Sequence, residues 1–386
     1  MNPKNENRRK FLLHSVQSAA GLMMVPLVGK ATAIPPKKII TPEIIRPQVA
    51  PRIKFAVIGM NHSHINGQIS VVEGGGGEFV AFYAKEKELM DEFRKKHPKV
   101  KAAASEQEIL NDKSIQLVLS AGIPQERAPL GIRVMKSGKD FMSDKPGITS
   151  LAQLAEVRKV QKATKQIYSI MYGERLENKA TVKAGELVKA GAIGKVIQTI
   201  GLGPHRMNPK SRPDWFFKMS DYGGIITDIG SHQFDQFLFF TGSTEADVVA
   251  SQIGNVNHPQ YPDLQDFGDV MVRGNGGVGY VRVDWFTPDG LKSWGDGRLT
   301  ILGTEGFIEI RKNVDIGGRE GGNHLFLVDN EGTKTIDTSD VDLPYGRQLV
   351  DDVVNRTETA MTQAHCFLTM ELALKAQAQA ERIKLG

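Results

Sequence analysis

The stretch "FAVIGMNHSHINGQ", residues 55–68, contains most of the parts of a phosphate-binding turn. A short apolar run ends in Gly59, as a first strand does before a dinucleotide loop with the pattern G-x-G-x-x-G. Asn61 replaces the second glycine and His64 the third. Asn tolerates left-handed backbone, and helix N-terminal amides beside an imidazole can still bind a pyrophosphate. We interpret the stretch as a modified dinucleotide loop in which Gly59, Asn61, His62 and His64 contact the cofactor.

Two patterns contain histidine. His62 and His64 form an H-x-H pair of a kind that metals use, but no nearby cysteine or acidic residue completes a ligand set, so we expect no metal. Asp228 and His232 are four residues apart, and a helix would place both on one face. Histidine suits general acid–base chemistry because its pKa lies near neutrality. The alternative for His232 is a packed, hydrogen-bonded core histidine.

Strands and helices alternate around the glycine loop. Apolar runs predict strands at 53–58, 78–84, 115–122 and 139–146, and helical patterns fall at 65–72, 86–96 and 127–138. Such alternation predicts a parallel sheet with right-handed crossovers. The modified loop therefore lies between the first strand and the first helix, where a dinucleotide loop belongs.

The end of the second predicted strand bears on the type of dinucleotide. An acid that binds the ribose diol is expected about twenty residues after the loop. The sequence "AFYAKEKE" has Ala84 and Lys85 at this point. A missing carboxylate beside a lysine favours a 2′-phosphate, so we predict NADP over NAD, with Lys85 as a cofactor ligand. A solvated start of the next helix is the alternative for Lys85.

The second half of the chain has a different pattern. Residues 268–286 predict a hairpin around a Gly-rich turn, and further strands are expected at 298–301, 306–310 and 324–328. These strands predict a large, mostly antiparallel open sheet. The final stretch, 362–384, is Ala-rich with helical spacing, and we expect it to pack back on the first domain.

Length and composition limit the class of protein. A chain of 386 residues favours two domains. The net charge of +5 is concentrated in residues 1–33, which hold Lys4, Arg8, Arg9, Lys10 and Lys30 against Glu6. The nearly neutral remainder lacks a basic stripe, so nucleic acid is not an expected partner. The single cysteine, Cys366, excludes an internal disulfide.

The first 33 residues have the layout of a signal peptide. Arg8-Arg9 precedes a modestly apolar stretch that ends in Ala31-Thr32-Ala33, and it resembles a twin-arginine export signal. Polar residues and Pro26 interrupt the stretch, so a stable membrane helix is not expected. Residues 34–50 have four prolines and predict a linker. We expect export to the periplasm by the twin-arginine machinery; a disordered basic tail is the alternative.

Four segments, in order, resemble the Gfo/Idh/MocA oxidoreductases, a family of sugar and polyol dehydrogenases. They are "SGKDFMSDKPGIT", "GELVKAGAIGKVIQTIG", "GGIITDIGSHQFDQFLFFTG" and "GTEGFIEI". The first matches the family's E-K-P loop with Asp144 in place of Glu, and the third matches its G-G-G-x-x-x-D-x-G-x-H segment. The resemblance covers the chain from about residue 52 to its end.

The resemblance implies roles for particular residues. Lys145, Asp228 and His232 would be catalytic, with Lys145 also near the nicotinamide, while Asp235 pairs structurally. Ser120 and Pro124 are further predicted cofactor ligands. The candidates for substrate binding at the domain junction and after it are Tyr172, Arg175, His205, Arg206 and Trp215, and a structural role is the alternative for each of them. In the family the open sheets pack face to face between subunits, which implies a homodimer or homotetramer.

The sequence therefore predicts an α/β protein with two domains. A Rossmann-type dinucleotide-binding domain is expected over 51–172, an α+β substrate and oligomerisation domain over 173–361, and a C-terminal helix over 362–386. The predicted function is NAD(P)-dependent hydride transfer at a hydroxyl or carbonyl of a sugar, polyol or glycoside. Because free nicotinamide is scarce outside the cytoplasm, export favours a tightly bound cofactor. The alternatives are a redox-assisted glycosidase or lyase and a non-catalytic sugar-binding descendant.

Overall fold

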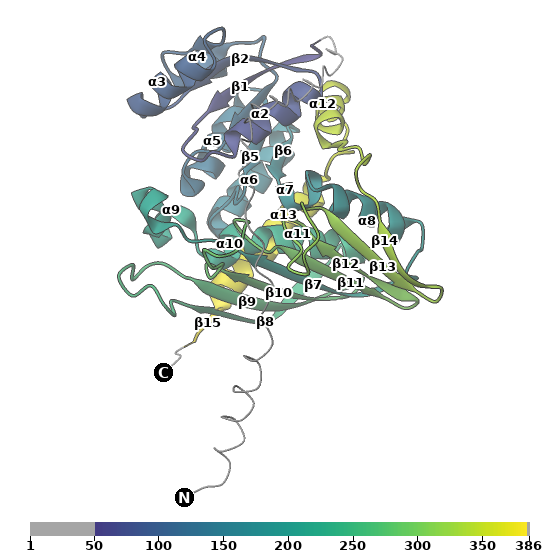
Figure 1. The fold of residues 1–386 in the computed structure, drawn as a ribbon. Helices are drawn as coiled ribbons and strands as arrows, with labels where there is room; N and C mark the ends of the chain where they lie inside the picture. The colour runs from purple at the N-terminus through teal and green to yellow at the C-terminus, as the bar shows by residue number, and fades with distance from the viewer. Residues whose placement is uncertain (1–50, 384–386) are drawn as a thin grey trace, which may run out of the picture. The chain divides into compact units, whose positions relative to one another are not determined.

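The computed structural model describes residues 51–383, so the predicted leader at 1–33 and linker at 34–50 lie outside the described residues. Two β-sheets organise this part of the chain, with helices packed on and between them (Figure 1). One sheet comes from the first half of the chain and the other from the second half. This order confirms the predicted fold class.

The first sheet is parallel throughout and has the strand order β3-β2-β1-β4-β5-β6. Its strands are β1 (Ile53–Ile58), β2 (Gly77–Tyr83), β3 (Lys101–Ala102), β4 (Leu117–Ser120), β5 (Asp140–Asp144) and β6 (Tyr168–Met171). β4 and β5 are buried at every position, as strands covered by helices on both faces must be. The strand order reverses between β1 and β4, and ligands of such sheets bind beside the carboxyl ends of the strands at that point.

Helices connect these strands. They are α2 (Ile65–Gly74), α3 (Lys87–Lys96), α4 (Glu106–Asn111), α5 (Pro124–Lys136) and α6 (Leu151–Thr164). Side-chain caps fix two of the starts, since Ser105 accepts from the Glu108 amide and Ser150 from the Gln153 amide. α5 begins at Pro124, earlier than the predicted 127, because proline at the first helical position needs no hydrogen-bonded N–H.

The second sheet has the strand order β14-β13-β12-β11-β7-β10-β9-β8-β15. Its strands are β7 (Val196–Pro204), β8 (Ala246–Gly254), β9 (Phe267–Gly274), β10 (Val278–Asp284), β11 (Arg298–Gly303), β12 (Gly306–Arg311), β13 (His324–Asp329), β14 (Gly332–Ile336) and β15 (Glu381–Arg382). Neighbours are antiparallel except for β7 with β10 and β8 with β15. β9 and β10 form the hairpin predicted at 268–286.

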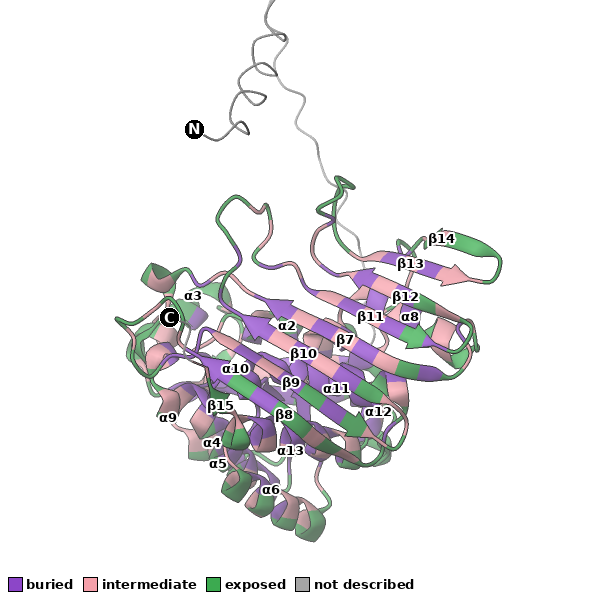
Figure 2. Cartoon of the chain, turned by 90° about the horizontal axis from the view of Figure 1, so that it is seen from below, coloured by how far each residue is buried: buried purple, intermediate pink, exposed green. Residues whose placement is uncertain are grey.

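Helices cover one face of the second sheet. The remaining helical segments are α7 (Gly173–Leu176), α8 (Lys179–Lys189), η2 (Pro209–Ser211), η3 (Asp214–Phe217), α9 (Met219–Tyr222), α10 (Ile225–Asp228), α11 (Gly230–Thr241), α12 (Tyr345–Asn355) and α13 (Gln363–Gln379). Figure 2 shows the other face, where buried and exposed residues alternate along the strands and the described part of the chain places no helix over them. Val249, Met271 and Leu302 are among the exposed apolar side chains on these strands.

The C-terminal helix α13 packs between the two sheets. It contacts α6 and β6 on one side and α10, α11 and β8 on the other, so it packs on both halves and not on the first alone. The Gln363 side chain accepts a hydrogen bond from the Tyr168 amide, and that of Gln377 accepts one from the Ile226 amide. A Cβ at Gly224 would lie 2.2 Å from Gln377 Oε1, so glycine permits this close approach. Within residues 51–383, none of the helices combines the length and the apolar character that crossing a membrane requires.

Candidate active site

The turn after β1 depends on Gly59. This residue has a φ of +80°, and a Cβ there would lie 3.1 Å from the Gly122 Cα and 3.2 Å from Ser120 Oγ. The Gly59 amide donates to the Tyr83 carbonyl at 2.9 Å, and its carbonyl accepts from the Ala121 amide at 3.0 Å. The turn is therefore held against the carboxyl ends of β2 and β4, where only glycine suits both the backbone and the space.

Asn61, at the second glycine position, connects two loops. Its Nδ2 donates to Glu86 Oε1 at 2.9 Å, and Glu86 lies just before α3, three residues after β2 ends. The expectation that no carboxylate stands at this end of β2 is therefore wrong. Lys85, the predicted 2′-phosphate ligand, forms an exposed ion pair with Glu126 at 2.8 Å. The preference for NADP stays a prediction.

His64, at the third glycine position, does not disturb the packing of α2. It is the residue before the helix, its side chain is half-exposed, and its Nδ1 lies 3.0 Å from Asp144 Oδ1. The helix begins only after it, so the imidazole does not need to fit between helix and sheet. An imidazole at the third glycine position is therefore compatible with close packing of α2 on the sheet.

Asp144, at the end of β5, also approaches His62, with 3.5 Å between Oδ2 and Nδ1. The expectation that no acidic residue completes a set with His62 and His64 is therefore wrong, because Asp144 lies 80 residues further along the chain. Burial and the neighbouring His64 lower the pKa of His62 to about 3, so this imidazole is neutral at pH 7. Hydrogen bonding accounts for the arrangement, and Arg127 adds positive charge 3.3 Å from the same carboxylate, so the geometry requires no metal.

Arg127, which the sequence interpretation missed, holds the loop after β5. It is buried on α5, and its Nε donates to the Gly122 carbonyl at 2.8 Å. Its Nη1 donates to the carbonyls of Asp144 and Pro146, each at 3.1 Å, and also to that of Lys145. One guanidinium thus fixes the loop that carries Lys145, in which the Lys145–Pro146 peptide is cis.

Lys145 and Asp228 form a buried ion pair with 2.9 Å between Nζ and Oδ1. They come from the end of β5 and the end of α10, so the pair joins the two halves of the site. Burial alone would raise the pKa of the Asp228 carboxyl, but the charge and hydrogen bond of Lys145 more than offset this, and the pKa is lowered. Asp228 is therefore ionised at neutral pH, and its hydrogen bond orients the Lys145 side chain.

His232 lies one turn after Asp228, as its spacing predicted. Ile229 between α10 and α11 has helical dihedral angles, so the two short helices continue each other. Burial lowers the pKa of His232 to about 4. Its Nδ1 is buried and has no hydrogen-bond partner among residues 51–383, and the same holds for the hydroxyl of Tyr172, whose ring centroid lies 6.2 Å away. The site thus contains a neutral imidazole with an unused nitrogen.

Glu174, at the domain junction, adds a further and largely buried carboxylate to the site. It accepts hydrogen bonds from Lys312 Nζ and, at 3.0 Å, from Gln233 Nε2. Burial would raise its pKa, but Lys312 and His232 lower it overall, so Glu174 is ionised. Lys312 follows 138 residues later in the chain, a separation at which sequence patterns give no signal.

Some of the predicted substrate ligands lie in the candidate site, whereas the donors of others bind elsewhere in the protein. His205 belongs to the site: burial and the charge of Lys145 lower its pKa to about 3, and its Nδ1 lies 3.1 Å from the Gly203 carbonyl. Trp215 is half-buried against Phe216. The substrate role expected for Arg175 is not supported, because its Nε and Nη2 bind Asp235 at 2.7 and 2.8 Å.

Arg206 has a positioning role where substrate binding was predicted. Its Nη2 donates to the carbonyl of Pro288 at 3.0 Å and to that of Leu291. Its backbone amide donates to the Trp294 carbonyl at 2.7 Å. Arg206 therefore fixes the loop between β10 and β11.

Comparison with known families agrees with this geometry. Residues 53–172 match an oxidoreductase family with an NAD-binding Rossmann fold, and residues 181–309 match the GFO/IDH/MocA C-terminal domain. The chain belongs to the Gfo/Idh/MocA family. The family and the parallel sheet together make it an NAD(P)-binding oxidoreductase.

Individual relatives support the same class. A putative oxidoreductase from Erwinia carotovora atroseptica SCRI1043 is 44% identical, with a TM-score of 0.84, over 86% of this chain and 100% of that one. Levoglucosan dehydrogenase in complex with NADH and levoglucosan shares the fold, with a TM-score of 0.70 and 17% identity over 85% of this chain and 95% of that one. D-xylose dehydrogenase of Paenarthrobacter nicotinovorans is 23% identical, and the match spans 36% of this chain and 37% of that protein.

The residues at the carboxyl ends of β1, β2 and β4 fit the dinucleotide of this Gfo/Idh/MocA chain. The turn at Gly59 leaves a space that a Cβ would fill. The hydrogen bond from Asn61 to Glu86 connects this turn to the loop before α3. Ser120 is buried at the end of β4 and accepts from the Gly122 amide at 3.2 Å, and Pro124 starts α5. A loop of this construction presents backbone amides and a helix start to a pyrophosphate.

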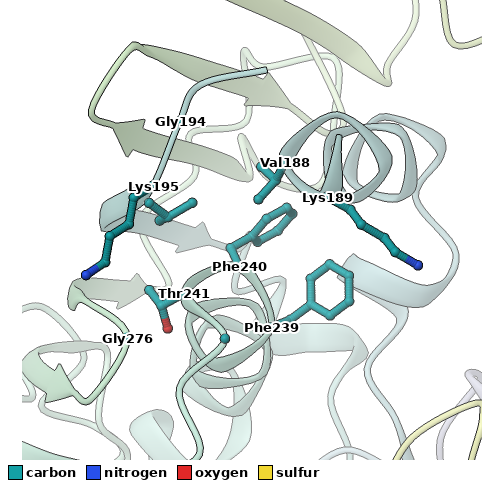
Figure 3. A pocket seen from close by; sticks show the side chains of 11 residues that line it. Val188, Lys189, Gly194, Lys195, Phe239, Phe240, Thr241 and Gly276 are labelled. Atoms are coloured by element: carbon teal, nitrogen blue, oxygen red, sulfur yellow. The ribbon is translucent and has the colours of Figure 1, made fainter. Parts of the chain in front are cut away.

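A hollow of about 430 Å³ lies elsewhere, between α8 and α11 (Figure 3). Phe239, Phe240, Lys189 and Lys195 line it, and none of the predicted site residues does. The candidate active site of this family member is therefore defined by its buried charges and not by this hollow.

Proposed function

We propose that the protein is an NAD(P)-dependent dehydrogenase that acts on a hydroxyl of a sugar, polyol or glycoside. The buried Lys145–Asp228 pair beside neutral His232, at the carboxyl edge of the dinucleotide-binding sheet, is the observation that carries the proposal. The D-xylose and levoglucosan dehydrogenases named above support a carbohydrate substrate.

The chain's own residues provide the proton chemistry. A bound nicotinamide supplies the hydride acceptor. Lys145, oriented by Asp228, donates a hydrogen bond to the substrate oxygen and stabilises the negative charge that develops on it. His232 accepts the hydroxyl proton, since its imidazole is neutral at pH 7. Arg127 and Glu174 hold Lys145 and His232 in a fixed electrostatic environment.

The proposal extends to the location and assembly of the protein. The pattern around Arg8-Arg9 supports twin-arginine export to the periplasm, and an exported enzyme that depends on scarce nicotinamide would retain its cofactor tightly. The uncovered face of the second sheet, with exposed Val249, Met271 and Leu302, supports a homo-oligomer.

Cofactor retention and turnover test the function directly. Purified full-length protein is denatured, and the supernatant is examined by absorbance and mass spectrometry for nicotinamide; calorimetry then compares NAD with NADP. Turnover is measured with D-xylose and levoglucosan. We expect retained or tightly binding nicotinamide and reduction of the cofactor by at least one carbohydrate.

Gly59→Val is the matched variant for this experiment. A side chain at a φ of +80°, 3.1 Å from Gly122, should abolish nicotinamide binding while circular dichroism shows a folded protein. A parent protein that neither releases nor binds a nicotinamide would contradict the proposed function.

A further inference from the structure

All three tryptophans of the chain lie in one aromatic cluster. Ring centroids are 4.5 Å apart for Trp294 and His205, and 5.4 Å apart for His205 and Trp285. Phe216 continues the cluster, 5.0 Å from Trp285 and 6.3 Å from Trp215. Tryptophan is the largest side chain, so its confinement to one region requires a structural or a functional reason.

Two of the tryptophan rings differ strongly in their exposure to solvent. Trp285 is 5% exposed and packs in the core, whereas Trp294 is 48% exposed at the outer end of the cluster. The buried Trp285 Nε1 has no acceptor in the described part of the chain, so an indole donor is left unpaired beside His205. A structural role explains the packing of Trp285 but leaves both the exposed ring and the unpaired donor unexplained.

The backbone beside Trp294 is fixed. Its carbonyl accepts from the Arg206 amide at 2.7 Å, and the Arg206 guanidinium binds carbonyls at the start of the same loop. A Cβ at the next residue, Gly295, would lie 2.2 Å from the Pro204 carbonyl oxygen, so glycine lets the loop lie directly on β7. The exposed indole is thus presented by a rigid support, which lowers the entropy cost of binding.

The cluster is continuous with the candidate active site. His205, in ring contact with both Trp294 and Trp285, follows β7 directly, and the charges of Lys145, Glu174 and Asp228 act on its imidazole. His205 therefore connects the exposed Trp294 ring with the residues around the buried ion pair.

We propose that Trp294 is the platform on which a carbohydrate ring of the substrate stacks. The C–H face of a pyranose is apolar and lies flat on an indole, while its hydroxyls remain free to form hydrogen bonds. This inference rests on the proposed function for the reaction itself, but the stacking contact can be measured without turnover.

Intrinsic fluorescence and steady-state kinetics of the full chain test the platform. The probes are D-glucose, methyl β-D-glucopyranoside and cellobiose, measured on the parent, Trp294→Ala and Trp294→Phe. We expect at least one saccharide to change the parent's tryptophan emission. Trp294→Ala should weaken that saccharide's binding, and raise KM for an oxidised one, by about tenfold, with a much smaller change in kcat, whereas Trp294→Phe restores most of the affinity.

Phe239→Ala is the matched control. Phe239 is 43% exposed and points into the hollow of Figure 3, which is the competing place for a sugar. This variant should leave KM unchanged. An effect of Phe239→Ala as large as that of Trp294→Ala, or an unchanged saccharide affinity in Trp294→Ala, overturns the platform.

The two proposals fail in different ways. Saccharide binding that depends on Trp294 but occurs without any nicotinamide binding supports the platform and contradicts the dehydrogenase. Turnover with the same KM in the parent and in Trp294→Ala supports the dehydrogenase and contradicts the platform.

Discussion

Two buried aspartates, Asp228 at the end of α10 and Asp235 within α11, lie seven residues apart, yet their surroundings differ. Asp235 accepts three hydrogen bonds, two from Arg175 and one of 2.8 Å with His365. Asp228 has one ion-pair contact, with Lys145, and its neighbour His232 has an unused nitrogen. Full satisfaction of a buried charge indicates a structural role, whereas incomplete satisfaction leaves capacity for a ligand.

The largest expected effect falls on the incompletely satisfied pair. Lys145→Ala removes the group that orients and polarises the substrate oxygen, so turnover should fall by roughly 10²–10⁴-fold. Stopped-flow or steady-state measurement of nicotinamide absorbance gives this value, and the nicotinamide content of the purified variant should remain that of the parent.

The double variant Lys145→Ala with Asp228→Asn is the control for stability. Lys145→Ala alone leaves Asp228 as a buried, unpaired charge, which destabilises the fold. The second substitution removes that charge, so thermal stability should recover while turnover remains lost. Recovery of turnover together with stability would assign the pair to the structural class.

The opposite result is expected for Asp235→Ala. Loss of this carboxylate leaves the buried Arg175 guanidinium unpaired and should lower the free energy of unfolding by about 3–5 kcal/mol. Urea denaturation measures the change, and kcat of the protein that remains folded should be close to that of the parent. A severe loss of kcat at unchanged stability would reverse the two roles.

The smallest expected effect concerns pH. Because burial lowers the pKa of His232 to about 4, the unfolded chain, with a histidine pKa near 6.5, binds more protons than the folded chain between these values. His232 therefore reduces stability as the pH falls from about 6.5 to about 4, by up to about 1.4 kcal/mol per pH unit.

His232→Gln should flatten the pH dependence of stability in that window, as measured by urea denaturation at several pH values. A parallel decrease of stability in the parent and in His232→Gln would show that His232 does not stay neutral. The contrast between Asp228 and Asp235 would then no longer rest on a neutral His232 beside Asp228.

Local sequence patterns predicted most of the strands and turns that position the candidate active site. The apolar runs predicted β1, β2, β4 and β5 of the six-stranded first sheet and the hairpin of the second, but not β3 and β6. Gly59 marked the turn that the backbone requires. The i, i+4 spacing of Asp228 and His232 placed them one turn apart. These features depend on period and backbone geometry, which a short window of sequence contains.

Contacts between distant segments were not predictable in the same way. Arg127 sits in an otherwise ordinary helix, and its role appears only when the loop of Lys145 folds against it. Asp144 completes a set with His62 and His64 from another strand end. Arg175 and Arg206 looked like ligands because they are cationic and near the domain junction, but acceptors elsewhere in the fold use their donors.

The position of α13 has a consequence for biosynthesis. Every residue of the first sheet has been synthesised once residue 171 is added, but the helix that supports Asp228 and Asp235 is made from residues 363–379. Until then the Ile226 amide lacks Gln377 and Asp235 lacks His365. The nascent chain therefore cannot complete its candidate active site until residues 363–379 have left the ribosome.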